Sequence, residues 1–209
     1  MDRYETRRLA ITGPTSETKD KLYKAIKDRY GSEVHCVPAV GGALLQLGLP
    51  NPEHETGNTK TELDRDLHIA IFAVSYNLDR ATVNYVYNKG GVRLIVHERG
   101  LPDVFGFCQA FHQHSFAGEV SRGEFKTLSE IQGRYHTVIF VPGPDKTVEG
   151  RLRLIWLGHK RLLTPREDQD PLAFGLSAVD ECFRENPPLP KEPRYEEAPE
   201  EEASAAPAT

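Results

Sequence analysis

Apolar residues along the chain follow two different spacings. Short continuous apolar runs are typical of strands buried on both faces of a sheet, and apolar positions repeated every three or four residues predict amphipathic helices. Four stretches of the first kind are expected to be strands: RRLAIT (7–12), VHCVPAV (34–40), VRLIVHERG (92–100) and HTVIFVPG (136–143).

Helices are predicted between these strands. The segment ETKDKLYKAIKDRYG has Leu22 and Ile26 at helical spacing and ends at a glycine, as helices commonly do. A similar pattern from Lys60 to Asn88 predicts one long helix that ends at the following Gly-Gly pair. Further predictions are a short helix or loop (41–50), an exposed loop (51–59), helices over 101–118 and 122–135, a partly helical basic segment (147–163) and a final helix from about Asp170.

Alternation of strands and helices determines the expected fold class. It implies parallel βαβ units and therefore a three-layer α/β fold with right-handed crossovers. In such sheets ligands bind beyond the carboxyl ends of the strands. The turns after residues 12, 40, 97 and 142 are therefore predicted to form one candidate surface.

Composition changes near residue 187. We predict one folded domain over 1–186 and a disordered tail rich in Pro and Glu over 187–209. The net charge is −5, and the tail has six Glu against one Lys and one Arg, which leaves the body close to neutral. Nucleic-acid binding is therefore not favoured. The tail and its PPLP motif are predicted to contact protein partners.

Other residue types exclude several classes of protein. No apolar stretch approaches the roughly 18 residues of a membrane helix, and MDRYETRR lacks the apolar core of a secretory signal. An intracellular, cytoplasmic location is expected. The three cysteines are far apart, and His112 and His114 cannot share a helix face, so neither a disulfide framework nor a metal site is predicted.

Residues 11–20, ITGPTSETKD, match part of a phosphate-binding loop. In the pattern GxxxxGK[ST], glycines let backbone N–H groups approach phosphate, lysine neutralises it and the hydroxyl binds Mg²⁺. Gly13 and Lys19 fit, whereas Thr18 replaces the second glycine and Asp20 replaces the hydroxyl. A carboxylate at a helix start repels a phosphate held there. An ordinary strand–helix turn is the alternative interpretation.

The ERG sequence at the end of the third predicted strand is a second candidate feature. In phosphoryl transfer a strand-end acid can act as base or hold Mg²⁺ indirectly, and a neighbouring arginine can clamp the phosphoryl group. Glu98 and Arg99 are therefore candidate catalytic residues. The basic stretch 151–166 is predicted to be a lid over phosphates, a surface for RNA or anionic lipid, or the basic edge of an amphipathic helix.

Four segments in order resemble the nicotinamide-riboside-kinase-like ATPase group of P-loop kinases. Members carry ITGGPGSGKTT, a DRG strand end, YDxVFxLPP and RxED, and this chain has ITGPTSETKD, HERGLPD, YHTVIFVPG and PREDQD. The resemblance implies a P-loop NTPase-like fold and ATP or GTP with Mg²⁺ as ligand. By position it implies nucleotide contacts from Gly13, Thr18, Lys19, Asp20 and Arg166, substrate contact from Asp103, and catalytic roles for Glu98 and Arg99.

Departures from the family pattern determine the expected function. AVGG (39–42) stands where relatives carry Glu and Arg, and no fifth strand is predicted after the last helix. We expect a pseudoenzyme with an impaired nucleotide site that acts as a binding or assembly module. Two alternatives are a phosphoryl transferase that uses ATP or GTP, and a protein that binds a nucleotide as a regulatory ligand.

Overall fold

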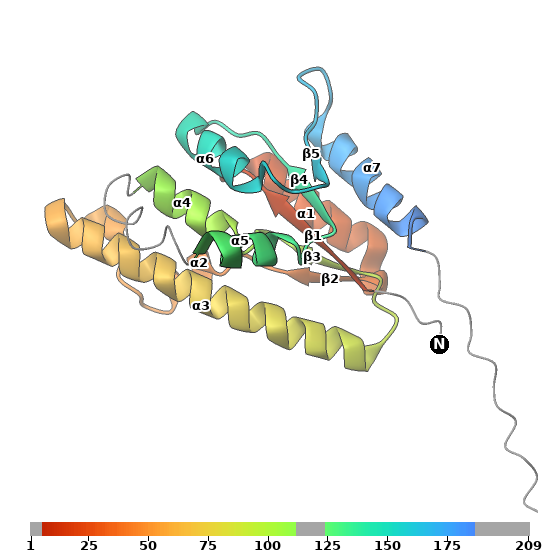
Figure 1. Cartoon of the computed structure of the whole chain (residues 1–209), viewed down its shortest axis with the longest axis horizontal. Coiled ribbons are helices and arrows are strands. Elements are labelled where there is room, and N and C mark those ends of the chain that lie inside the picture. Colours follow the sequence, from red (N-terminus) through yellow and green to blue (C-terminus); the bar gives the residue numbers. More distant parts are fainter. Residues whose placement is uncertain (1–5, 112–123, 187–209) are drawn as a thin grey trace, which may run out of the picture.

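A five-stranded parallel sheet forms the centre of the molecule (Figure 1). The structure is a computed structural model that describes residues 6–111 and 124–186. The strand order is β2-β3-β1-β4-β5, which confirms the expected three-layer α/β fold. The strands are β1 (Arg7–Thr12), β2 (Val34–Val37), β3 (Leu94–His97), β4 (Thr137–Phe140) and β5 (Leu162–Leu163).

Helices cover both faces of this sheet. Helices α1 and α7 pack on one face, and α3, α4, α5 and α6 pack on the other (Figure 1). The elements are α1 (Glu17–Tyr30), η1 (Gly31–Glu33), α2 (Gly41–Gln46), η2 (Pro52–His54), α3 (Gly57–Lys89), α4 (Asp103–Phe111), α5 (Glu124–Gln132), α6 (Lys146–Trp156) and α7 (Pro171–Arg184).

Central strand β1 shows why the sheet needs helices on both sides. Successive side chains of a strand point to opposite faces. Leu9 and Ile11 pack into the cluster that contains α1 and α7, whereas Ala10 packs with Trp156 on the other face. None of these four side chains exposes surface to solvent, so both layers of helices are part of the core.

The observed elements differ from the predicted ones in three places. The second strand ends at Val37 because Pro38 has no N–H to donate to a ladder. The predicted loop 51–59 contains a turn of 3₁₀ helix and the start of α3. A short fifth strand, β5, precedes α7 within the predicted basic segment. The rest of the helix predicted over 101–118, with His112 and His114, lies outside the described residues, as does the predicted tail.

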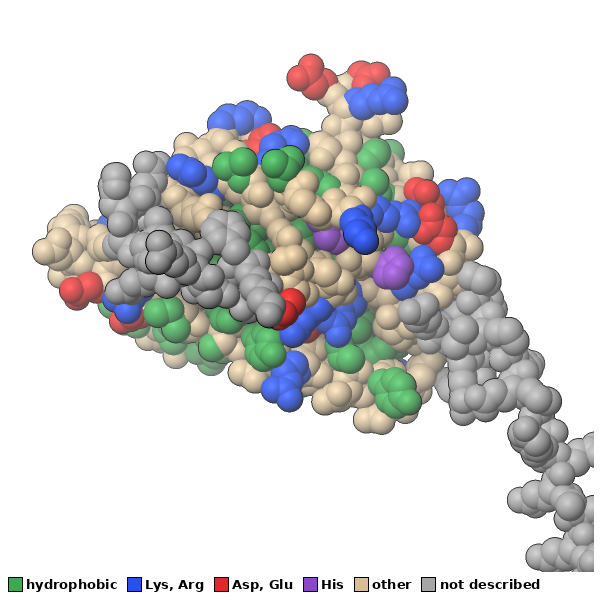
Figure 2. Space-filling view, in the orientation of Figure 1, with side chains coloured by type: hydrophobic (Ala, Val, Ile, Leu, Met, Phe, Trp, Pro, Cys, Tyr) green, Lys and Arg blue, Asp and Glu red, His purple; other side chains and the backbone are tan. Residues whose placement is uncertain are grey.

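Helix α3 is the longest element, with 33 residues. At 1.5 Å per residue it is about 50 Å long. Its outer side is partly hydrophobic, and green side chains mark this edge of the molecule in Figure 2. The exposed large hydrophobic residues on it are Ile69, Val74, Tyr85 and Tyr87. No helix within the described ranges is long and apolar enough to span a membrane.

Candidate phosphate-loop site and adjoining pocket

The strand, turn and helix predicted around residues 11–20 are present. The loop between β1 and α1, residues 13–16, is called the first loop below. Ser16 is the N-cap of α1, and its side chain accepts the Lys19 N–H at 3.3 Å. Gly13 has a φ of 129°, and a Cβ there would lie 2.0 Å from the Val141 carbonyl oxygen. Only glycine fits this position. Thr18 lies inside α1, and no described residue other than glycine has a positive φ, so Thr18 does not strain the loop.

Lys19 is buried, with 1% of its surface exposed. Its Nζ lies 3.3 Å from the Glu98 carbonyl oxygen and 3.6 Å from the Glu98 Oε1. Burial, with Arg99 nearby, lowers the pKa of Lys19, and Glu98 opposes this effect. An ammonium group has three donors, and here it has one carbonyl and one distant carboxylate oxygen as partners. The Lys19 cation is therefore incompletely compensated.

Glu98 connects three elements at the rim of the sheet. Its Oε2 accepts the Ala39 N–H at 2.8 Å, just beyond β2, while its Oε1 faces Lys19 of α1. The carboxylate itself follows β3. The prediction that the turns after residues 12, 40 and 97 lie on one surface is therefore confirmed.

Arg99 spans the first loop. Its Nη1 donates to the Gly13 carbonyl oxygen at 2.9 Å and its Nη2 to the Thr15 Oγ1 at 2.9 Å. The guanidinium carbon also lies 4.5 Å from the centre of the Phe107 ring. The side chain that was predicted to clamp a phosphoryl group thus holds the loop itself in this structure.

Asp103, predicted to contact substrate, is buried and accepts hydrogen bonds from three groups of the protein, although it also lines the adjoining pocket. It is 1% exposed, and its Oδ1 accepts from Thr12 Oγ1 and Trp156 Nε1, both at 2.6 Å. Its Oδ2 accepts the Gly100 N–H at 3.2 Å. Burial raises the pKa of Asp103, and Arg99 opposes this effect. The carboxylate joins β1, the 100–103 turn and α6, which points to a positioning role.

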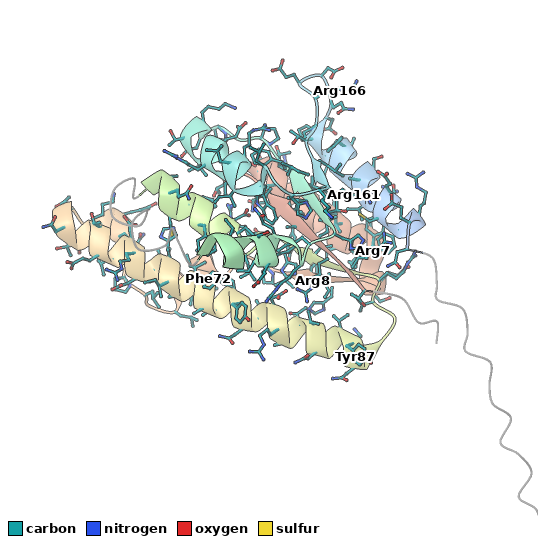
Figure 3. All side chains as sticks on the ribbon, in the orientation of Figure 1. Arg7, Arg8, Phe72, Tyr87, Arg161 and Arg166 are labelled. Atoms are coloured by element: carbon teal, nitrogen blue, oxygen red, sulfur yellow. The ribbon has the colours of Figure 1, made fainter. Side chains whose placement is uncertain are left out.

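Arg166 is not brought to this site. It is exposed in the segment between β5 and α7, which projects from the body of the molecule in Figure 3. Elsewhere in the basic stretch, Arg153 pairs with Glu149, and Trp156 is fully buried. The stretch therefore combines an amphipathic helix with an outward loop, and its described residues form no lid over the first loop.

A pocket of about 440 Å³ adjoins the loop. Three of the four predicted turns line it, whereas the turn after β4 packs Gly143 against Pro14. This volume suits a small-molecule ligand. Charged lining residues are Lys19, Asp20, Glu98, Arg99 and Asp103, and the other walls include Val37, Val40, His68, Ile71, Ser75, Leu78, His97, Leu101, Val104 and Phe107.

Sequence reasoning missed the contribution of α3 and of His97 to this pocket. In the sequence, these residues belong to a helical or an apolar pattern, which is typical of residues with a structural role. They reach the cavity because α3 lies beside the end of β3. Within residues 6–111 and 124–186 there is no group of three His, Cys, Asp or Glu side chains that could hold a metal ion.

Substituting methionine for Lys19 tests what the buried ammonium contributes to folding. We expect the free energy of unfolding to stay unchanged or to rise by about 1–2 kcal/mol, because replacing a buried charge by an apolar chain of similar size removes a desolvation cost. Glu98 is not left isolated, since it is 21% exposed and keeps the Ala39 N–H. Urea unfolding measures the change, with Lys24→Met, at an exposed position of α1, as control. A loss above about 2 kcal/mol would identify Lys19 as a structural residue.

Comparison with known proteins places the fold. No protein-family model and no curated protein matches the sequence. Deoxyadenosine kinase from M. mycoides, with products dCMP and a flexible dCDP bound, aligns with a TM-score of 0.50 and 13% identity over 85% of this chain and 99% of that chain. The same kinase with bound dATP aligns with a TM-score of 0.52 and 11% identity over the same shares.

Thymidylate kinase from Ehrlichia chaffeensis gives a TM-score of 0.46 and 11% identity over 84% of this chain and 98% of that chain. At identities this low, the alignments show similarity of fold alone. The two alignments with deoxyadenosine kinase, together with the parallel sheet, show that residues 6–111 and 124–186 adopt a three-layer α/β P-loop NTPase-like fold. The narrower resemblance to the nicotinamide-riboside-kinase-like group stays a prediction.

Proposed function

We propose that this domain binds a nucleoside monophosphate or a similar phosphorylated small molecule and transfers phosphoryl groups poorly, if at all. In this proposal it is a pseudoenzyme that acts as an intracellular binding or assembly module. The tail 187–209 would provide contacts for protein partners. The observation that carries the proposal is that Arg99, the candidate phosphoryl clamp, already binds Gly13 and Thr15 of the loop, whereas the buried Lys19 cation is incompletely compensated.

The chemistry of phosphoryl transfer supports a low rate. Catalysis of this reaction is almost entirely positioning and electrostatic stabilisation of the transferring group. Loss of one preorganised donor in other enzymes costs about 3–4 kcal/mol of transition-state stabilisation, or roughly a hundredfold or more in rate. Here Asp20 replaces the hydroxyl that would bind Mg²⁺, and Arg99 would have to leave Gly13 and Thr15 to reach a phosphate.

Binding, in contrast, is favoured by the charge on Lys19. An anion in the pocket would compensate the buried ammonium better than the Glu98 carbonyl does. The pocket also offers apolar walls next to its charged residues, an arrangement that fits a ring joined to a phosphate. Deoxyadenosine kinase, similar in fold, has been seen with dCMP, dCDP and dATP bound. A nucleoside monophosphate is therefore the proposed ligand class.

Titration calorimetry tests the proposal directly. We expect dCMP or dAMP to bind, Mg-ATP and Mg-GTP to bind no tighter than micromolar, and phosphoryl transfer between them to stay at the background rate. Lys19→Met should weaken monophosphate binding by at least about tenfold, the equivalent of 1.4 kcal/mol. Lys24→Met, exposed on the same helix, should leave it unchanged. The proposal fails if none of these monophosphates binds or if turnover is rapid.

A phosphoryl transferase is the second candidate. It is favoured by one observation, which is that Lys19, Glu98 and Arg99 all line a single pocket. In that case ligand binding would draw Arg99 away from the loop and onto a phosphate. A tight Mg-ATP complex with turnover that Lys19→Met abolishes would support this candidate over the first.

A further inference from the structure

His97 and Asp79 form a buried pair in the wall of the pocket. His97 is the last residue of β3 and is 3% exposed, and Asp79 lies on α3 and is 2% exposed. The His97 Nε2 lies 3.5 Å from the Asp79 Oδ1. Neither atom makes a hydrogen bond of standard geometry with any described residue. The two atoms are therefore at ion-pair distance, without a hydrogen bond of standard geometry to each other or to another described residue.

Two arginines hold Asp79 in place. Its Oδ2 lies 3.2 Å from the Arg8 Nη1 and 3.6 Å from the Arg134 Nη1. Burial raises the pKa of Asp79, and Arg8 and Arg134 oppose this effect. Since both guanidinium groups are always charged, the ionised carboxylate is the form that suits this environment. Asp79 can then only accept hydrogen bonds.

The His97 ring is neutral and held by its neighbours. Burial lowers its pKa to about 3, and the nearby Arg8 and His35 add to this effect. The Tyr135 ring meets it edge-on, with centres 5.3 Å apart and planes at 81°. The Tyr135 hydroxyl oxygen in turn accepts the Leu101 N–H at 2.9 Å. The imidazole is thus held between a carboxylate and an aromatic ring.

A neutral imidazole has one N–H donor and one acceptor nitrogen. An acceptor nitrogen facing a carboxylate oxygen would be repelled, so the proton belongs on Nε2, next to Asp79. The other ring nitrogen, Nδ1, is then an acceptor, and His97 itself lines the pocket. The partner that satisfies Nδ1 must be a hydrogen-bond donor.

We infer that the Asp79–His97 pair makes this pocket selective for ligands that carry a hydrogen-bond donor at their buried end. The ligand class rests on the proposed function. Within that class, the pocket should bind amino-substituted bases such as cytosine and adenine more tightly than their oxo counterparts, uracil and hypoxanthine. An oxo group would place an acceptor against an acceptor in a site with apolar walls, where an unpaired polar group is costly. His97 is the specificity-determining residue and Asp79 is its positioning residue.

The tautomer is measurable without any ligand. Long-range ¹H–¹⁵N correlation spectra of the imidazoles should show His97 as a neutral ring with its proton on Nε2 at pH 7. His54, which is exposed, provides the reference signal in the same spectrum and is assigned by its loss in His54→Phe. A protonated ring, or a proton on Nδ1, would overturn the inference whatever the ligand is.

Selectivity is measured by calorimetry with two matched pairs, dCMP against dUMP and dAMP against dIMP. The amino member of each pair should bind at least about tenfold tighter, from one hydrogen bond gained and one acceptor–acceptor contact avoided. His97→Phe keeps the ring and its contact with Tyr135 and removes the acceptor. It should reduce the preference to about twofold or less, whereas His54→Phe should leave it unchanged.

The possible outcomes separate this inference from the proposed function. Equal affinity within each pair overturns the selectivity and leaves monophosphate binding standing. Persistence of the preference in His97→Phe also overturns it, since another group must then recognise the base. If none of the four monophosphates binds, the proposed function fails and no selection operates in this pocket.

Discussion

Replacing Asp103 with alanine should lower the free energy of unfolding by about 3–4 kcal/mol. The substitution would leave the Trp156 Nε1–H, the Thr12 hydroxyl and the Gly100 N–H without their acceptor in a buried region. Each buried donor left unpaired costs about 1–3 kcal/mol, and relief of the buried Asp103 charge offsets part of the sum. Equilibrium unfolding in urea, monitored by Trp156 fluorescence, measures the loss.

Two further variants serve as a conservative substitution and as a surface control for Asp103→Ala. Asp103→Asn should cost less than alanine, because its amide oxygen can still accept from Thr12 and Trp156 while its amide nitrogen meets the Gly100 N–H. Asp28→Ala, at an exposed position of α1, should change stability by no more than about 0.5 kcal/mol. If Asp103→Ala costs less than about 1 kcal/mol, the carboxylate is not a structural centre and its predicted substrate role returns.

The internal contacts of Asp103 show where a linear motif stops being informative. An acid shortly after an Arg-Gly pair fits the position of a substrate-binding residue in related kinases. Its actual partner, Trp156, is 53 residues further along the chain, at the end of α6. Nothing in the local sequence indicates that these side chains meet. The contact with a distant helix, which the spacing within the motif does not encode, adds a structural partner to this acid.

The elements themselves were more accessible to prediction. Strands β1, β3 and β4 are buried over most of their length, so each contains three consecutive apolar residues that are typical of a strand inside a sheet. Strand β5 has two residues and depends on pairing with β4, so it has no sequence pattern of its own. The sequence therefore predicts the type of an element best where that element is buried.

For the site, too, the sequence predicts one aspect and not another. That the first loop and Glu98 meet at one rim follows from the rule that parallel strands end at a common edge. How Lys19, Glu98 and Arg99 use their charges depends on distances of about 3 Å, which no periodicity encodes. The Asp79–His97 pair also escaped detection, because α3 reads as a helix whose inner face is merely structural.

Restoring the phosphate-loop residues should raise the affinity for Mg-ATP by about a hundredfold. The variant is Asp20→Thr combined with Thr18→Gly. Asp20 is exposed in the first turn of α1 and lines the pocket, so its carboxylate opposes an anion that the helix start would otherwise attract. Like charges about 4 Å apart near a protein surface repel by about 4 kcal/mol, so relief of part of that repulsion accounts for the gain.

Most of this gain should come from Asp20→Thr alone, which removes the charge and supplies the hydroxyl for Mg²⁺. Thr18 already has a helical conformation, so Thr18→Gly adds only closer approach of the backbone and costs about 0.5 kcal/mol of helix stability. Calorimetry with Mg-ATP measures both effects, with Asp28→Thr on the exposed side of α1 as the control. Unchanged affinity in the double variant would mean that the loop does not enclose a phosphate, and that the first turn only joins a strand to a helix. A hundredfold gain would instead mean that the loop keeps the shape of a phosphate site and that the charge of Asp20 is what keeps a triphosphate out.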